Sequence, residues 1–189
     1  MKDRFSYNEA EAADPIRIEQ VFAEKPGGGL VVEPGFDAPE TTAVGLNSDG
    51  KYAVIKSYRL LADVGAEDST INIAKGSGIV SGDVLGYGKK AVACTKVDTS
   101  ANDKDVVTVT MGVVIKKGES LYQAKAAHDS AATPIYTPEY ILGNKIFGGK
   151  GEQPVRLING ANVRKETACI GKDIEAMLPT KIGRASCRE

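Results

Sequence analysis

The sequence contains no tryptophan, a single histidine and no charge excess of either sign. Its 24 Lys and Arg residues against 25 Asp and Glu residues give a formal net charge of -1. Nucleic-acid binders usually carry a basic excess that offsets phosphate charge, so this balance argues against a nucleic-acid partner. No apolar run reaches the roughly 20 residues that a helix needs to cross a bilayer. Residues 1–6 also lack the apolar stretch of a secretory signal. We therefore expect a soluble protein, made in a cytoplasm, with neither nucleic acid nor membrane as a partner.

Soft metal ligands are scarce as well. Cys94 and Cys169 lie far apart, neither belongs to a C-x-x-C pair, and His128 is the only histidine. Because a structural zinc site takes about four Cys or His ligands, we predict no metal site. Isolated cysteines of a cytoplasmic protein are usually small apolar core residues, and we expect that role for both.

The chain also offers little for catalysis or for a cofactor. His128 is followed directly by Asp129 and Ser130, but a catalytic triad is assembled in space and not by sequence adjacency. We expect a solvent-facing loop histidine. Residues 26–29 are glycine-rich but are not followed by Gly-Lys-Ser/Thr and a helix, so no phosphate loop is predicted. Carboxylates are scattered, and a pair acting as acid and base stays open. We predict no enzyme, with no catalytic residue, no cofactor-binding residue and no cofactor.

Short apolar segments rich in β-branched residues dominate residues 46–181 and predict a mainly β domain. The clearest is Val106–Ile115, which together with Lys90–Val97 predicts a hairpin around a polar turn. Segments spaced about 8 to 12 residues apart are typical of a small barrel or sandwich of short antiparallel strands. Ser120–His128 and Lys172–Leu178 favour helix, and the latter predicts a short C-terminal helix. The other expected strands span Ile16–Phe22, Ala53–Leu61, Thr70–Ala74, Ile79–Val80 and Val84–Leu85.

The first 45 residues differ in composition from the rest. Residues 1–14 are polar, and residues 23–45 are so rich in glycine and proline that they disfavour both helix and central strand. We expect residues 1–45 to form an extended N-terminal arm with a Gly/Pro-rich loop, ahead of the β-rich domain of residues 46–181. An arm of this kind buries little alone and needs a partner surface to offset its ordering entropy. Strand addition from the arm would supply main-chain hydrogen bonds to such a surface.

One pattern occurs twice. Ile79–Leu85 and Ile115–Leu121 share I-x-x-G-[DE]-x-L. In each, we expect an apolar residue to enter a tight turn, glycine to supply the permissive dihedral and leucine to return to the core. Two similar turns in one barrel and a duplicated half-barrel both fit the pattern.

Residues 182–189 do not resemble native protein. They match, codon for codon, the translation of a common short-read sequencing adapter, and an unbroken match in one reading frame is very rare by chance. We predict an adapter-derived artefact and exclude these residues from the fold prediction. The match predicts a metagenomic source and a native chain that continues past Lys181. The alternative is an ordinary basic tail.

Four parts of the chain stand out together: the segment Asn8–Ile16, the Gly/Pro-rich segment, the short-stranded middle and the ending Leu157–Lys165. In these parts the chain resembles phage head fiber and capsid decoration proteins, in particular those of phages and prophages of gut Bacteroidales. The similarity lies in the general character of these segments and in their order along the chain, over about residues 5–180. The resemblance implies a structural virion protein without catalytic residues. It also implies a homotrimer on the capsid exterior, bound to the major capsid protein and made in the bacterial host cytoplasm. Head fibers commonly have a longer distal part, and this chain departs from them in being shorter.

Two other functions stay open. A carbohydrate-binding or adhesive β-sandwich module would need an exposed aromatic platform, for which the candidates are Tyr87, Tyr122, Tyr136 and Tyr140. A hydrolytic enzyme, such as a capsid-maturation protease or a wall-degrading enzyme, would have only His128 for a histidine mechanism.

Overall fold

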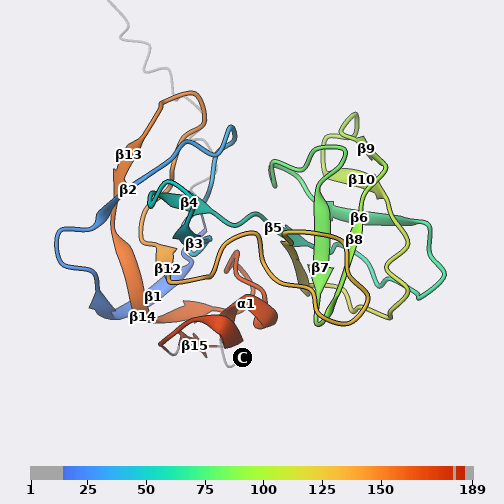
Figure 1. Cartoon of the computed structure of the whole chain (residues 1–189). Helices are drawn as coiled ribbons and strands as arrows, with labels where there is room; N and C mark the ends of the chain where they lie inside the picture. The colour runs from blue at the N-terminus through green and yellow to red at the C-terminus, as the bar shows by residue number, and fades with distance from the viewer. Residues whose placement is uncertain (1–14, 181, 186–189) are drawn as a thin grey trace, which may run out of the picture.

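The computed structural model describes residues 15–180 and 182–185, and these form two β lobes side by side (Figure 1). The first lobe contains residues 15–56, 136–180 and 182–185, and the second lobe contains residues 57–135. The chain therefore leaves the first lobe, builds the second and returns. The fold is mainly β with one short helix near the C-terminus, which confirms the predicted fold class.

An eight-stranded sheet forms the first lobe, in the order β1-β14-β12-β3-β4-β2-β13, with β15 parallel to β14. Its inner side chains, among them Val31, Val44 and Leu142, are fully buried. The helix α1 (Lys172–Met177) lies beside this sheet and confirms the predicted C-terminal helix. The strands are β1 (Ile18–Glu24), β2 (Gly29–Val31), β3 (Ala43–Leu46), β4 (Tyr52–Val54), β12 (Tyr140–Leu142), β13 (Gln153–Val155), β14 (Leu157–Arg164) and β15 (Ile182–Ala185).

Two smaller sheets form the second lobe, β5-β11-β7-β8 and β6-β10-β9. They enclose a core of their own that includes Tyr58, Ile73 and Leu121, all fully buried. The predicted hairpin forms only in part: β9 pairs with β10, Val97 opposite Val107, whereas Lys90–Ala93 is β8 of the other sheet and residues 109–115 do not continue the strand. The strands are β5 (Ser57–Arg59), β6 (Thr70–Ala74), β7 (Val84–Tyr87), β8 (Lys90–Ala93), β9 (Lys96–Asp98), β10 (Lys104–Thr108) and β11 (Ser120–Gln123).

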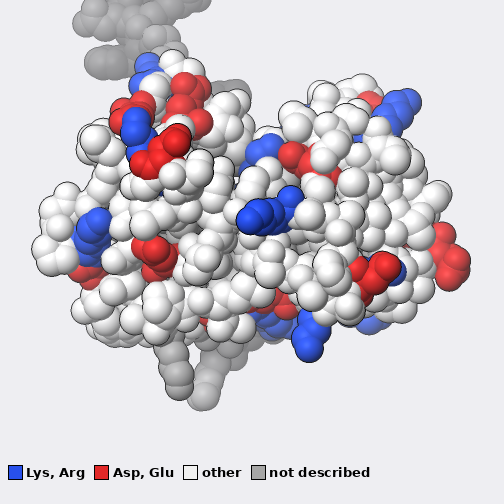
Figure 2. All heavy atoms as spheres, in the orientation of Figure 1, with Lys and Arg blue, Asp and Glu red and all other residues white. Residues whose placement is uncertain are grey.

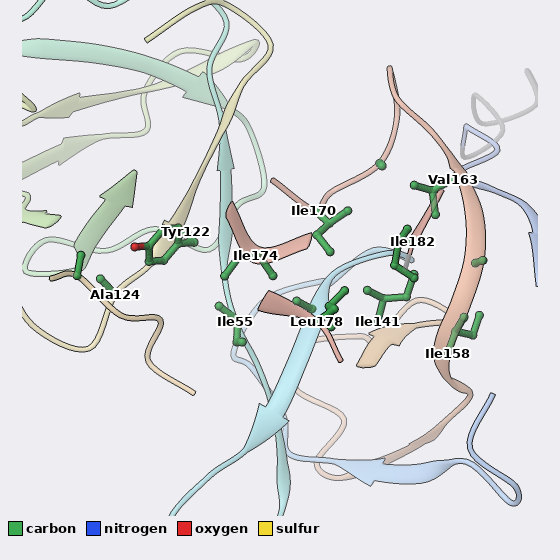
Figure 3. Close-up of a cluster of buried hydrophobic side chains, with 14 of the residues drawn as sticks. Ile55, Tyr122, Ala124, Ile141, Ile158, Val163, Ile170, Ile174, Leu178 and Ile182 are labelled. Atoms are coloured by element: carbon green, nitrogen blue, oxygen red, sulfur yellow. The ribbon is translucent and has the colours of Figure 1, made fainter. Parts of the chain in front are cut away.

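A third apolar cluster joins the lobes (Figure 3). Tyr122 comes from the second lobe, Ile174 and Leu178 come from α1 and the residue after it, and Ile141 and Ile158 come from the large sheet. Each of these side chains is at most 9% exposed. Because apolar burial is the dominant favourable term in folding, this shared core fixes the lobes against each other.

One hydrogen-bonded turn occurs three times. In each, one residue of the turn, called the turn residue, donates its N–H to the carbonyl of a residue distant in the chain, called its partner. The N–H of that partner donates in return to the carbonyl of the residue that follows the turn residue. The turn residues and partners are Thr41 with Leu142, Gly82 with Cys94, and Gly118 with Leu60. All three turn residues have positive φ, at 68°, 92° and 84°. The two glycine turns confirm the dihedral expected from the repeated pattern, and the leucines that follow, Leu85 and Leu121, are fully buried.

The turn at Thr41 was not visible as a repeat in the sequence, because Thr41 stands where the other two turns have glycine. A β-branched residue at positive φ is strained, so the surrounding structure must hold it. The Thr41 N–H donates to the Leu142 carbonyl at 2.8 Å, and the Thr41 hydroxyl accepts from the Cys169 N–H at 2.8 Å. These bonds tie the turn to two distant parts of the first lobe.

The segment 23–45 is not the loop or arm that its composition predicted. It contributes β2 and the start of β3, and Val31, Ala38 and Val44 within it are fully buried. The expected boundary between residues 45 and 46 falls inside β3. Residues 1–14, the start of the predicted arm, lie outside the described residues.

The helix expected over Ser120–His128 is also wrong. Its first half is β11, which pairs with β5 and β7. Leu121 and Tyr122 are buried on opposite sides of this central strand, so tertiary burial overrides the helix propensity of the Ala- and Lys-rich stretch. Over the described residues, α1 is the only helix and is far too short to span a bilayer.

Residues 182–185, predicted to be part of an adapter-derived tail, form β15 alongside β14. Ile182 is 5% exposed and packs in the shared core. Strand addition uses main-chain groups that every sequence carries, so this pairing does not test the adapter origin. Residues 186–189 lie outside the described residues.

Candidate functional site

The strand β1 is the most exposed element of the large sheet. It ends the sheet order, and the described residues pair with only one of its two edges. Of its residues only Ile18 and Val21 are half-buried, and both pack against the shared core. Phe22 is 59% exposed, and Ile16, just before the strand, is 60% exposed. Large apolar side chains on an unpaired sheet edge are typical of a contact surface.

Irregular pairing with β14 explains why Phe22 points outward. Ile18 lies opposite Val163 and Gln20 opposite Asn162, and the register shifts again between Val21 and Ala23. Each extra residue in a bulge reverses the side-chain alternation that follows it. The alternation expected for Ile16–Phe22 was therefore wrong in detail. The adjacent apolar residues Val21 and Phe22 were the one sign in the sequence that an apolar side chain would be exposed here. Two successive residues of a strand face opposite sides, so both cannot point into the core.

The acidic residues of β1 do not protect its free edge, because they pair with Arg164 of β14 and with Arg156, the residue just before β14. The Arg164 Nε donates to Glu19 at 3.1 Å, and the Arg156 Nη2 donates to Glu24 at 2.7 Å. The opposite end of the sheet differs: β13 carries Pro154, which lacks an N–H to offer to a new strand. The two ends of the sheet are thus unequal, and β1 is the end open to a partner.

Charge gives no competing site on the face that Figure 2 shows. Lys, Arg, Asp and Glu side chains are interspersed over both lobes there, without an extended patch of one sign. A surface of this kind does not steer a highly charged partner over long range.

A buried polar network lies at the point where the chain crosses from the first lobe to the second. Asp83 accepts hydrogen bonds from the Lys56 ammonium at 2.9 Å, the Tyr58 hydroxyl at 3.0 Å and the Val80 N–H at 3.1 Å. Burial, together with the nearby Asp83 charge, raises the pKa of Tyr58 well above its usual value. The partners satisfy one another, so the network serves to fix the crossing rather than to react.

The structure gives His128 a role within its own loop. Its Nδ1 accepts the backbone N–H groups of Ser130, at 3.1 Å, and Ala131, at 3.0 Å. Both His128 and Asp129 are exposed. The two hydrogen bonds to the His128 ring hold the turn formed by residues 128–131. The three adjacent residues are therefore a capped loop.

The four tyrosines considered as a platform are distributed over both lobes. Tyr122 is 1% exposed and donates its hydroxyl to the Gly88 carbonyl at 3.0 Å. Tyr87 is half-buried on β7 in the second lobe, and Tyr136 and Tyr140 are half-buried in the first. Tyr140 meets Tyr52 edge to face, with ring centroids 5.7 Å apart. The fold does not bring these rings onto one exposed face.

Of the three cysteines, the two in the described residues differ in their surroundings. Cys94 is buried and its thiol donates to the Val80 carbonyl at 3.3 Å, which confirms the expected core role. Cys169 is only partly covered, at the junction of the lobes. In the described part of the chain, no three His, Cys, Asp or Glu side chains lie close enough to share a metal ion.

Comparison with protein-family models, with curated proteins and with solved structures gave no match to this chain. The fold and the site thus define a two-lobed β protein whose candidate functional feature is the exposed edge strand β1.

Proposed function

We propose that the protein is a structural component of a bacteriophage head, which decorates the capsid exterior as a homotrimer bound to the major capsid protein. The sequence resemblance to head fiber and decoration proteins suggests this class. The exposure of Phe22 on β1 and of Ile16 just before the strand carries the proposal. Its action would be binding and display, without a chemical step.

The rigid union of the lobes supports such a role. A decoration protein must hold one shape while it rests on a lattice, and the core shared between α1, β14 and the second lobe provides this. In the proposal, the N-terminal arm expected from the sequence contacts the shell. The strand itself then faces a second copy of the chain.

The β1 surface fits a contact between copies arranged in a ring. Full burial of a large apolar side chain contributes about 1.5–3 kcal/mol, so Phe22 and Ile16 together supply a useful part of an interface. A contact between unlike surfaces closes into a ring when the rotation between copies is suitable, and three copies give the trimer. The near-zero net charge of -1 does not oppose self-association.

The test is the solution mass of the Phe22→Ser variant, measured by light scattering after size exclusion. We expect a trimer for the unaltered chain and dissociation for Phe22→Ser. The matched control is Phe147→Ser, because Phe147 is also exposed, at 48%, but lies away from β1 under the Lys145 ammonium. A trimer that survives Phe22→Ser, or one lost equally in Phe147→Ser, would contradict the proposed contact.

A further inference from the structure

A pocket opens at the seam between the two lobes and receives side chains from both. Arg17, Thr42 and Cys169 line it from the first lobe, and Ser57, Arg59 and Ser77 line it from the second. We call it the seam pocket. It is separate from the exposed face of Phe22.

The lining of the seam pocket is basic. It contains Arg17, Arg59 and Lys75 and no carboxylate. Lys75 is already compensated, since its ammonium forms an ion pair with the buried Asp105 at 2.9 Å and donates to the Ala101 carbonyl at 2.8 Å. The charge available to a ligand is therefore that of the two arginines.

Neither arginine is paired with a carboxylate among the described residues. The Arg17 Nη1 donates to the Pro15 carbonyl at 3.4 Å, and the Arg59 Nη1 donates to the Glu166 carbonyl. Both acceptors are neutral. A partly covered guanidinium with only neutral partners retains most of its attraction for an anion.

Two buried polar atoms of this lining have no hydrogen-bond partner in the described structure. They are the Arg17 Nε, from the first lobe, and the Ser77 Oγ, from the second. A buried donor left without an acceptor destabilises the fold. Both residues line the seam pocket, so an acceptor bound there could partner these atoms.

The Cys169 thiol lies near both guanidinium groups and is hydrogen-bonded to that of Arg17. Burial raises the pKa of this thiol, while the charges of Arg17 and Arg59 act in the opposite direction. Since burial has the larger effect, the thiol stays neutral at pH 7 and leaves both arginine charges uncompensated.

We propose that the seam pocket binds a small oxyanion, a carboxylate or a phosphate, held by Arg17 and Arg59 with a hydrogen bond from the Ser77 hydroxyl. Guanidinium groups match the planar geometry of oxyanions and bind them through two parallel hydrogen bonds. Because Arg17 belongs to the first lobe and Arg59 and Ser77 belong to the second, the bound anion also holds the two lobes together. Binding to the folded state alone then raises the stability of the chain by mass action.

The test is calorimetric titration of the full chain with inorganic phosphate and, separately, with acetate, at constant ionic strength set by sodium chloride. We expect saturable binding of at least one of the two. Arg17→Gln should weaken it about tenfold or more, because a charge-assisted hydrogen bond is lost. Arg156→Gln is the matched control, since Arg156 is an exposed arginine paired with Glu24 outside the pocket.

Binding of phosphate alone identifies a phosphate source, and binding of acetate identifies a carboxylate source. If Arg17→Gln does not fold, Ser77→Ala provides the same comparison with a smaller loss of affinity. Absence of saturable binding for both anions would overturn the proposal, as would equal weakening in Arg156→Gln.

Discussion

The buried network around Asp83 makes a sharp prediction about stability. Replacement of Asp83 by alanine removes the acceptor of the Lys56 ammonium, the Tyr58 hydroxyl and the Val80 N–H. The Asp83 side chain is 10% exposed and that of Lys56 is 15% exposed, so water replaces the lost acceptor poorly. The variant therefore leaves an uncompensated Lys56 charge and an unpaired Tyr58 hydroxyl in the interior, while the Val80 N–H belongs to a residue that is 55% exposed.

Removal of one partner from a buried ion pair costs about 3–5 kcal/mol. We expect the lower end of this range, about 3 kcal/mol, because the flexible Lys56 side chain is close enough to the surface to turn partly toward water. Addition of Lys56→Met to Asp83→Ala removes the stranded charge. The double variant should therefore be more stable than the single one, which is a non-additive result expected only for residues in direct contact.

Urea unfolding followed by circular dichroism measures these differences. Glu152→Ala is the control, because Glu152 pairs with Lys51 where the two side chains are 41% and 53% exposed; exposed pairs contribute little, so its effect should be much smaller. A loss below about 1 kcal/mol for Asp83→Ala, or a double variant no more stable than the single one, would refute the proposed network.

Three further predictions concern the turns, the alkaline limit and the C-terminal strand. Gly82→Ala and Gly118→Ala should each destabilise the fold by about 1–2 kcal/mol in urea unfolding, because an added Cβ meets no atom within 4 Å and the cost is that of positive φ alone. The raised pKa of Tyr58 means that the unfolded chain loses this proton first, so stability should fall as the pH rises above about 10. Tyr58→Phe should make that fall shallower over a pH series. Truncation after Lys181 should leave a folded chain that is less stable by about 1.5–3 kcal/mol, the burial of the Ile182 side chain; an unfolded product would contradict this.

Local sequence patterns predicted the elements whose own residues carry a strong signal. The strand expected over Thr70–Ala74 has the same bounds as β6, and the hairpin of β9 and β10 closes over a short polar turn. The repeated glycine turn was also predictable, since only glycine enters positive φ at no steric cost. These features depend on residues within a few positions of one another.

Elements that depend on distant partners were missed. The strand β2 has only three residues and pairs with β13, more than a hundred residues later, so glycine and proline around it outweighed a weak strand pattern. The helix expected at Ser120–His128 failed for the same reason, because β5 and β7 decide the state of that stretch.

The candidate site shows the same limit. The alternation of residues 16–22 predicted a half-buried strand, and β1 covers most of that stretch. The exposure of Phe22, however, follows from bulges in the pairing with β14, and a register cannot be derived from one strand alone. The seam pocket likewise combines residues from both lobes, which no local pattern connects.

The central claim, a homotrimeric decoration protein, is tested most directly by the solution mass of the unaltered chain, from light scattering after size exclusion over a range of concentrations. The proposal predicts a stable species near three times the 19.9 kDa of one chain. A mass of one chain at every concentration would contradict the homotrimer and leave β1 without its proposed partner.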